Sequence, residues 1–363
     1  MNVSFVDFKR EWKFFEKKFL LAFKKFGQKG IYVLGPEVES FEKDFAKYCG
    51  YKYAIGMSTG LSVLETILRA NRIGVGDEVI TVANSAVATS LAISNVGAKP
   101  IFCDIREDFL IDQEKIEKLI TGKTKVILPV HLFGRICDMK KINAIAKKYG
   151  LIVVEDACQA HGANFVGVSA INTKAFSFYP TKNLGAIGEG GAVVTNDEKV
   201  RDFAMSYRNY GQYGRYNHVI KASNYRLEPL HCVLLDIKLK YLNKFIQKRQ
   251  VIAKKYIEET EKIKGIIVND FDKNCAYHLF VIRVLDGKRD ELRKHLKEKG
   301  VETLVHYPTA IHHQPCYREE YKNLKLANVD RFQEEILSLP CYPFLENQEL
   351  AYVIKNIRNF FAT

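Results

Sequence analysis

Short apolar runs alternate with helical stretches through the first half of this 363-residue chain, and this alternation limits the folds that the chain can adopt. Segments with helical periodicity, such as residues 61–70 and 139–149, separate most of the apolar runs. The predicted strands cover residues 53–57, 78–82, 99–103, 125–130 and 151–154. Continuous apolar strands separated by helices are typical of a mostly parallel sheet that has helices on both faces. The sequence therefore predicts an α/β fold.

The pattern changes after about residue 240. A helical stretch over residues 241–263 leads to a strand-like run over residues 277–284 and to a basic helix over residues 289–299. No low-complexity linker precedes these segments, so we expect the two parts to pack tightly. A chain of this length can form one large and one smaller domain. We predict a large cofactor-binding domain over residues 1–240 and a smaller C-terminal α+β domain over residues 241–363.

The composition excludes several classes of protein. The chain is 47% hydrophobic, but no apolar run approaches the length of a membrane span, and the N-terminus lacks the residue order of a secretion signal. The eight cysteines show no paired spacing of the zinc-site kind, and several lie in the apolar context of reduced, buried thiols. We therefore expect a cytoplasmic protein with no membrane partner and no metal centre.

The net charge of +13, from 55 basic and 42 acidic residues, raises the question of nucleic-acid binding. However, the lysines are spread along helix-patterned stretches such as residues 140–141 and 254–255. The chain has no arginine-rich tract interleaved with aromatic residues, and no helix-turn-helix or zinc-finger spacing. A lysine-rich surface that attracts an anionic small molecule is the better interpretation, and no nucleic-acid partner is expected.

Lys182 is the most informative single residue. It follows a strand-like run that ends in two acids, Glu155 and Asp156. In open parallel sheets, ligands bind beyond the carboxyl ends of the strands. An amine held there near a buried carboxylate suits a Schiff base with an aldehyde cofactor, because the carboxylate keeps a pyridine nitrogen protonated. Two acids at the end of an apolar strand need a positive partner, and either a pyridinium or a structural salt bridge meets that need.

Two glycine-containing segments lie before and after Lys182 in the sequence. Residues 58–62 follow a strand and open a helix, which makes either an anion cradle or an ordinary helix cap. Residues 188–195 predict a tight turn into a returning strand, where glycines allow close backbone approach. This turn is expected to frame the lysine loop.

Several histidines have mainly structural interpretations. We interpret His161 as a turn histidine with hydrogen-bond partners, and His131 as part of a turn at a strand end. His306, His312 and His313 cluster in sequence, but no carboxylate or cysteine spacing supports metal ligation. A substrate-lining loop is the preferred interpretation of that cluster.

Six motifs follow one another along almost the whole chain, at residues 35–38, 76–80, 155–162, 177–191, 224–227 and 306–308. Together they resemble the sugar aminotransferases of the DegT/DnrJ/EryC1/StrS family, which are fold type I enzymes that use pyridoxal 5′-phosphate. The resemblance is strong because the order and spacing of unconnected motifs agree. It implies a fold type I transferase with a mostly parallel central sheet, helices on both faces and a smaller C-terminal α+β domain.

The resemblance assigns roles around the cofactor ring. It implies that Lys182 binds the cofactor covalently as an internal aldimine and later moves protons. It also implies that Asp156 pairs with the pyridine nitrogen and that Gln159 lies beside the ring. Ala86 is a departure, since many members carry an aromatic residue there that stacks on the ring.

Further roles concern the cofactor phosphate. The resemblance implies that Thr59, Gly60, Leu61 and Ser177 hold it, and that Asn224 reaches the phosphate of the neighbouring subunit. Active sites shared in this way would make a homodimer obligatory. Leu61 is a second departure, because the family often has threonine after the glycine, and here only the backbone amide can donate.

The activity implied is transfer of an amino group from L-glutamate to a nucleotide-linked keto-sugar, in deoxyamino sugar biosynthesis for a product such as a cell-surface polysaccharide. Residues 3–8 and 31–38 favour the branch that acts at C-3 of a dTDP-3-keto-6-deoxyhexose. Amination at C-4 of a UDP-, GDP- or dTDP-4-keto sugar is the alternative within the family. A non-nucleotide amino-cyclitol precursor and a cofactor-holding regulatory protein without turnover also stay open.

Overall fold

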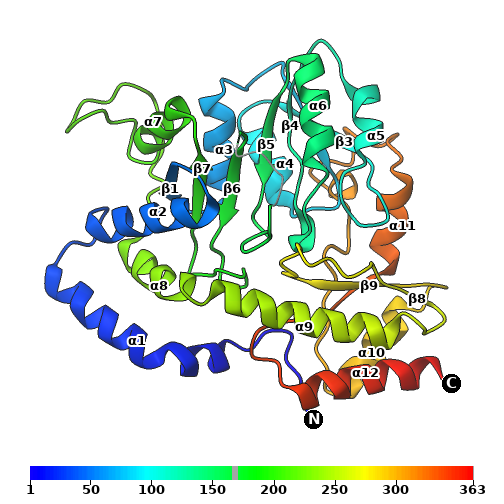
Figure 1. The fold of residues 1–363 in the computed structure, drawn as a ribbon. Coiled ribbons are helices and arrows are strands. Elements are labelled where there is room, and N and C mark those ends of the chain that lie inside the picture. The colour runs from blue at the N-terminus through cyan, green and yellow to red at the C-terminus, as the bar shows by residue number, and fades with distance from the viewer. Residues whose placement is uncertain (166–170, 363) are drawn as a thin grey trace.

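The computed structural model describes residues 1–165 and 171–362. The central element is a seven-stranded sheet (Figure 1). The strand order is β1-β7-β6-β5-β4-β2-β3. The strands are β1 (Tyr53–Met57), β2 (Glu78–Val82), β3 (Lys99–Cys103), β4 (Thr124–Ile127), β5 (Ile152–Asp156), β6 (Thr173–Ser177) and β7 (Gly191–Thr195). All neighbours pair in parallel except β7, which is antiparallel to both β1 and β6. The predicted mostly parallel sheet is confirmed, and β7 is the returning strand expected after the glycine turn.

Helices cover this sheet and extend beyond it. The longer ones in the described residues are α1 (Phe8–Lys29), α2 (Pro36–Cys49), α3 (Gly60–Ala70), α4 (Val87–Asn95), α6 (Met139–Tyr149), α7 (Glu198–Tyr207), α8 (Pro229–Leu239), α9 (Leu242–Thr260), α10 (Arg289–Glu298), α11 (Ala327–Glu335) and α12 (Asn347–Phe361). Short turns of helix are α5 (Gln113–Ile116), η1 (Glu117–Leu119), η2 (Leu132–Gly134) and η3 (Ile311–His313). The helices expected from periodicity therefore form, with shifts of a few residues at their ends.

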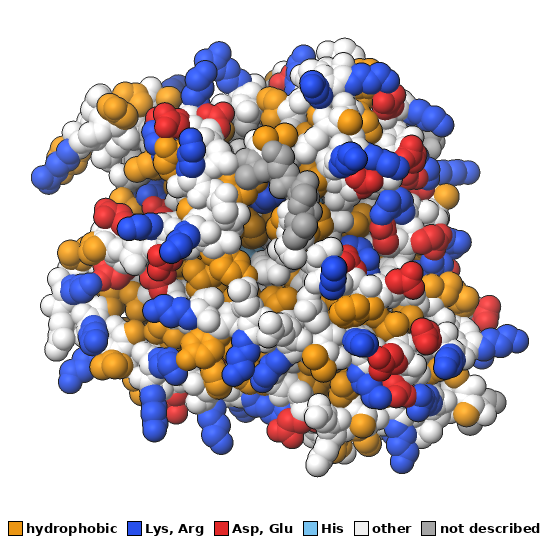
Figure 2. All heavy atoms as spheres, viewed as in Figure 1, with side chains coloured by type: hydrophobic (Ala, Val, Ile, Leu, Met, Phe, Trp, Pro, Cys, Tyr) orange, Lys and Arg blue, Asp and Glu red, His pale blue; other side chains and the backbone are white. Residues whose placement is uncertain are grey.

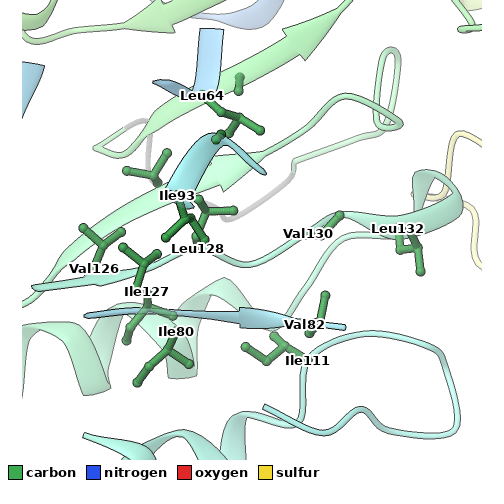
Figure 3. Close-up of a cluster of buried hydrophobic side chains, with 14 of the residues drawn as sticks. Leu64, Ile80, Val82, Ile93, Ile111, Val126, Ile127, Leu128, Val130 and Leu132 are labelled. Atoms are coloured by element: carbon green, nitrogen blue, oxygen red, sulfur yellow. The ribbon is translucent and has the colours of Figure 1, made fainter. Parts of the chain in front are cut away.

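The sheet is buried on both faces because successive side chains of each strand point to opposite sides. Val193 of β7 packs in one core with α3 and α4, whereas its neighbours Ala192 and Val194 pack in another core with α2 and α8. Figure 3 shows part of the first core, where Leu64 of α3 and Ile93 of α4 lie among side chains of β2 and β4. This packing explains why the strands read as continuous apolar runs.

A smaller core lies in the C-terminal part of the chain. It contains a three-stranded sheet in the order β10-β9-β8, formed by β8 (Ile266–Ile267), β9 (Phe280–Val284) and β10 (Ile336–Leu339). Side chains of α9, α10 and α12 pack on it, and so does Val3 from the N-terminus, which pairs with Val301. The N-terminal segment therefore belongs with this core, and the division at residue 240 stays a prediction.

Charged and apolar side chains are mixed on the face of the molecule shown in Figure 2. Lys and Arg side chains are spread over the face in Figure 2 with acidic groups among them, and they do not gather in one patch. Among the described residues, no helix combines the length and hydrophobicity that a membrane crossing requires. All eight cysteines are free thiols.

Candidate active site

The carboxyl ends of β1, β5 and β6 meet at one edge of the sheet, since these strands run in the same direction. A cavity of about 430 Å³ opens there. Every residue that the sequence assigned to the cofactor lines it except Asn224: Thr59, Gly60, Leu61, Asp156, Gln159, Ser177 and Lys182. Ala86 lines it as well. The structure thus brings together residues that are separated by more than a hundred positions in sequence.

Lys182 is held by a tight loop between β6 and β7. The backbone N–H of Lys182 donates to Tyr179 O (2.9 Å). Two further backbone bonds close the loop, from Phe178 N to Gly190 O (2.7 Å) and from Ala186 N to Phe178 O (2.8 Å). Burial lowers the pKa of the Lys182 amine, although negative charge at nearby groups acts in the opposite direction. A lowered pKa increases the fraction of neutral amine, which is the nucleophilic form that attacks an aldehyde.

Asp156 faces the cavity and is almost completely buried. Its Oδ2 accepts a hydrogen bond from the Thr89 hydroxyl (2.9 Å), and its Oδ1 accepts one from the backbone N–H of Cys158 (3.1 Å). These two bonds fix the carboxylate without neutralising its charge. Asp156 therefore remains available for a cationic group in the cavity.

Glu155, the preceding acid, lies on the other face of the sheet and forms a structural ion pair. It is fully buried, bonds to Lys174, and lies 2.8 Å from His131 Nε2 and 2.8 Å from Asn172 Nδ2. Burial alone would raise the pKa of Glu155, but the hydrogen bond to His131 and the charge of Lys174 outweigh it and lower the pKa to about 2. The salt-bridge interpretation is therefore confirmed for Glu155, and the pairing of Asp156 with a pyridine nitrogen stays a prediction.

The N-terminus of α3 forms the opposite end of the cavity. Thr59 and Ser62 cap the helix reciprocally, with bonds of 2.9 Å from Ser62 N to Thr59 Oγ1 and 3.0 Å from Thr59 N to Ser62 Oγ. A Cβ on Gly60 would lie 2.8 Å from Ser177 Cβ, so only glycine lets the helix end approach β6 this closely. Free amides at a helix N-terminus bind anions. A lysine, a carboxylate and an anion cradle around one cavity fit pyridoxal 5′-phosphate.

Gln159 links the cavity to the C-terminal part of the chain. Its Oε1 accepts a hydrogen bond from Phe133 N (2.7 Å), and its Nε2 donates to the Tyr307 hydroxyl (3.3 Å). The side chain is thereby fixed in orientation beside the cavity, and its place beside the cofactor ring stays a prediction. The bond to Tyr307 was not foreseen, because the two residues are far apart in sequence.

Other lining residues were also missed by sequence reasoning. Thr89, Val130, Tyr179 and Glu189 line the cavity, and Thr89 bonds Asp156 directly. The signal for Thr89 was its place near the start of a helix that follows a strand end. Asn224 is exposed and outside the cavity of its own chain, so its role toward a neighbouring subunit stays a prediction.

The expectation that His161 has hydrogen-bond partners is wrong for the residues that the structure describes. The ring is buried beside Phe176 and Phe178, and neither ring nitrogen has a partner in this part of the chain. Burial, with a smaller effect of Lys182, lowers the pKa of His161 to about 3. His131 does shape a strand-end turn, since its Nδ1 accepts from Cys137 N (3.2 Å).

His312 and His313 meet a carboxylate that is distant in sequence. Their Nε2 atoms lie 3.0 and 2.9 Å from the same oxygen of Asp330 on α11. The three side chains form a hydrogen-bonded junction between η3 and α11, in which the Nδ1 atom of His312 has no partner among the described residues, and their ligand atoms lie within 4.8 Å of one another. The absence of a metal centre stays a prediction.

Comparison with known proteins agrees with this geometry. The DegT/DnrJ/EryC1/StrS aminotransferase family matches residues 14–358. The chain is 41% identical to the dTDP-3-amino-3,6-dideoxy-alpha-D-galactopyranose transaminase of Aneurinibacillus thermoaerophilus, with 99% of each chain covered. It is 38% identical to the dTDP-3-amino-3,4,6-trideoxy-alpha-D-glucose transaminase of Streptomyces venezuelae, covering 99% of this chain and 96% of the relative.

A solved structure extends the agreement to the fold. The structure of DesV from Streptomyces venezuelae, in complex with a ketimine intermediate, superposes with a TM-score of 0.96 at 37% identity and covers 100% of this chain and 99% of that one. This chain therefore belongs to the DegT/DnrJ/EryC1/StrS family and is a pyridoxal phosphate-dependent aminotransferase.

Proposed function

We propose that the enzyme moves the amino group of L-glutamate to C-3 of a dTDP-linked 3-keto-6-deoxyhexose. The observation that carries this proposal is that both relatives named above are transaminases of dTDP-3-amino sugars and align over nearly the whole chain. The cavity at the strand ends supports the same reaction class, since it holds Lys182, Asp156 and the α3 N-terminus around one space. Amination at C-4 is the alternative within the same chemistry.

The residues of this chain divide the work of the reaction. When bound, the cofactor supplies an electron sink for the charge that develops at the substrate carbon. Asp156, fixed by Thr89, holds a proton on the ring nitrogen so that the sink is effective. Lys182 takes the proton from the Cα of the amino donor and later returns a proton to the sugar carbon that receives the amino group. Its lowered pKa suits this proton transfer. Gln159 restricts movement at the cavity wall through its bonds to Phe133 N and the Tyr307 hydroxyl.

We further propose a homodimer in which Asn224 completes the phosphate site of the partner subunit. The segment between α7 and α8 projects beyond α7 (Figure 1) and carries the exposed side chains of Tyr210, Tyr213 and Tyr216. Asn224 lies at the end of this segment and is exposed. An exposed polar residue that follows an exposed aromatic segment suits a contact between copies of the chain.

The free thiols support a cytoplasmic location.

The two half-reactions test the proposal separately. L-Glutamate alone should convert the lysine-bound cofactor to its amine form, with a loss of the visible absorption band and release of 2-oxoglutarate. A panel of dTDP-, UDP- and GDP-linked 3-keto and 4-keto sugars should then be offered to the amine form. Return of the visible band with a dTDP-3-keto sugar at a higher kcat/KM than with any 4-keto sugar is the expected result.

Two other outcomes would point elsewhere. A preference for a 4-keto sugar would move the amination to C-4 and leave the transaminase assignment intact. If neither glutamate nor any sugar changed the spectrum of the cofactor-loaded protein, a cofactor-holding regulatory role would replace catalysis. The presence of both Lys182 and Asp156 in the cavity favours turnover.

A further inference from the structure

A second cavity, of about 280 Å³, lies against Lys182 and reaches toward the C-terminal core. Lys182 and Tyr179 line both cavities, so the second one opens beside the reactive amine. Its other walls include Arg249 of α9, His278 before β9, and His306 from the loop before η3. The N-terminal segment covers it, with the ring of Phe5 stacked on His306 at 5.7 Å between centroids.

The electrostatics of this second cavity are unbalanced. Arg249 is only 6% exposed, and in the described part of the chain its guanidinium bonds to backbone carbonyls and to no carboxylate. Glu11 is close enough to act on Arg249, but it is ion-paired with Lys238. No Asp or Glu is among the described residues that line this cavity. Buried cations that lack an opposite charge are costly, so the cavity is suited to an anion.

Hydrogen-bond donors stand beside the cations. His278 is 7% exposed, and its Nδ1 has no partner among the residues that the structure describes. His306 is oriented by a 2.9 Å hydrogen bond between its Nδ1 and Ser338 Oγ, which leaves Nε2 for another contact. Burial and the charge of Lys182 lower the pKa of both rings, that of His306 to about 4. Neutral imidazoles offer one N–H each, and they can donate it to a carboxylate oxygen.

We propose that this second cavity is the subsite for a carboxylate of the amino donor, with Arg249 supplying the charge and His278 and His306 supplying hydrogen bonds. The inference rests on the proposed transamination from glutamate and extends it to the residues that select the donor. The volume of about 280 Å³ is just below the range of about 300–1,000 Å³ for cavities that hold drug-sized ligands, so it suits an amino acid rather than a nucleotide-linked sugar. A carboxylate held there would place the donor's amino group beside Lys182, which borders both cavities.

Glutarate is the probe for this subsite. It carries two carboxylates and no amine, so it binds without being transaminated. Isothermal titration of the cofactor-loaded and cofactor-free protein should give one glutarate site per chain in both forms. The double variant His278→Leu with His306→Leu should bind glutarate at least tenfold more weakly, and His278→Gln with His306→Gln should recover part of the affinity because the amides can donate. Arg249 is left unchanged, since its carbonyl bonds also support the backbone.

The matched control is His313→Gln, because His313 of the same histidine cluster is exposed, bonds to Asp330 and lines neither of the two cavities that border Lys182. It should leave the glutarate affinity unchanged. Circular dichroism and thermal unfolding establish that each variant is folded, and the glutamine pair serves if the leucine pair is not. The proposal is overturned if folded cavity variants bind glutarate as tightly as the wild type.

The half-reactions give a second readout and separate this proposal from the proposed function. In the leucine pair, the glutamate concentration at half-saturation should rise at least tenfold while the limiting rate changes by less than threefold. If glutamate converts the wild-type cofactor but the variants show no change in half-saturation, the subsite is wrong and the transaminase proposal stands. If glutamate never converts the wild-type cofactor, the donor assignment falls, and the glutarate titration still decides whether the cavity binds a carboxylate.

Discussion

The sheet presents two faces at the end of β5, and a carboxylate on each face meets different surroundings. Asp156 lines the cavity at the strand ends, where the Thr89 hydroxyl and a backbone amide fix it. Glu155, on the other face, is fully buried and bonded to Lys174 and His131. Asp156 remains available to a cationic ligand, whereas Glu155 forms an ion pair that links β5 to β6. Adjacent residues of one type therefore serve binding or stability according to the face that they occupy.

The largest expected effect lies on the cavity face, at Lys182. Lys182→Ala removes the amine that we propose binds the cofactor and moves the proton, so turnover should fall by more than about 10³-fold. The visible absorption of the lysine-bound cofactor should disappear with it. Lys174→Met is the matched control, because Lys174 lies on the opposite face against Glu155. This control should keep the absorption band while lowering the unfolding temperature, and a normal rate in Lys182→Ala would refute the assigned role.

Asp156→Asn is expected to give the next largest change. An amide has nearly the same shape but no charge, so it cannot keep the pyridine nitrogen protonated. The limiting rate of the glutamate half-reaction should fall by about 10²-fold or more. Stability should change much less, since the amide oxygen can accept from the Cys158 N–H while the amide NH2 donates to the Thr89 hydroxyl. A variant with wild-type rate would show that the two faces differ less in function than their geometry indicates.

Glu155→Gln tests the stability face. Against the effect of burial, the hydrogen bond to His131 and the charge of Lys174 lower the pKa of Glu155 to about 2, so the carboxylate contributes stability at neutral pH, although burial also lowers the pKa of Lys174 and offsets part of that contribution. Because the folded-state pKa is the lower one, this contribution is present above pH 4.5 and is lost as the pH falls toward 2. Urea unfolding at pH 7 and at pH 3 should therefore show a difference between wild type and variant that narrows at the lower pH.

The contrast between the faces also shows what the sequence could predict. The parallel sheet and the returning strand followed from local patterns, because strands and turns depend on neighbouring residues, whereas the roles of the residues around Lys182 came from the resemblance to the family. The choice between a pyridinium and a salt bridge for the acid pair did not follow. It depends on Lys174 and Thr89, which approach from β6 and from α4 only after the chain has folded.

The contacts that close the site could not be predicted either, because they join residues that are distant in sequence. Gln159 meets Tyr307 across the boundary between the main sheet and the C-terminal part, at a separation that no local pattern reports. Arg249 lies within a helix whose prediction was correct, but its burial against carbonyls of residues 277–278 could not be inferred from helical periodicity. The proposed role of Asn224 depends on how two copies of the chain meet, which no local pattern within one copy reports.

The smallest effect is expected from Leu61→Thr, within the cavity face itself. Leu61 occupies the first turn of α3, where only its backbone amide can bind the cofactor phosphate. A threonine hydroxyl adds one hydrogen bond to a charged ligand at the cost of some apolar packing. One such bond contributes about 0.5–1.5 kcal/mol, so the affinity for pyridoxal 5′-phosphate should rise by about two- to tenfold.

Leu61→Val is the control for this change, because valine has the shape of threonine without the hydroxyl. Cofactor affinity, measured by titration of the cofactor-free protein, should therefore rise in the threonine variant and not in the valine variant. Equal affinity in the two variants would mean that the phosphate is held by backbone amides alone. In that case, leucine at position 61 does not lower the affinity for the cofactor, and the helix N-terminus formed by Thr59 and Gly60 is sufficient as an anion site.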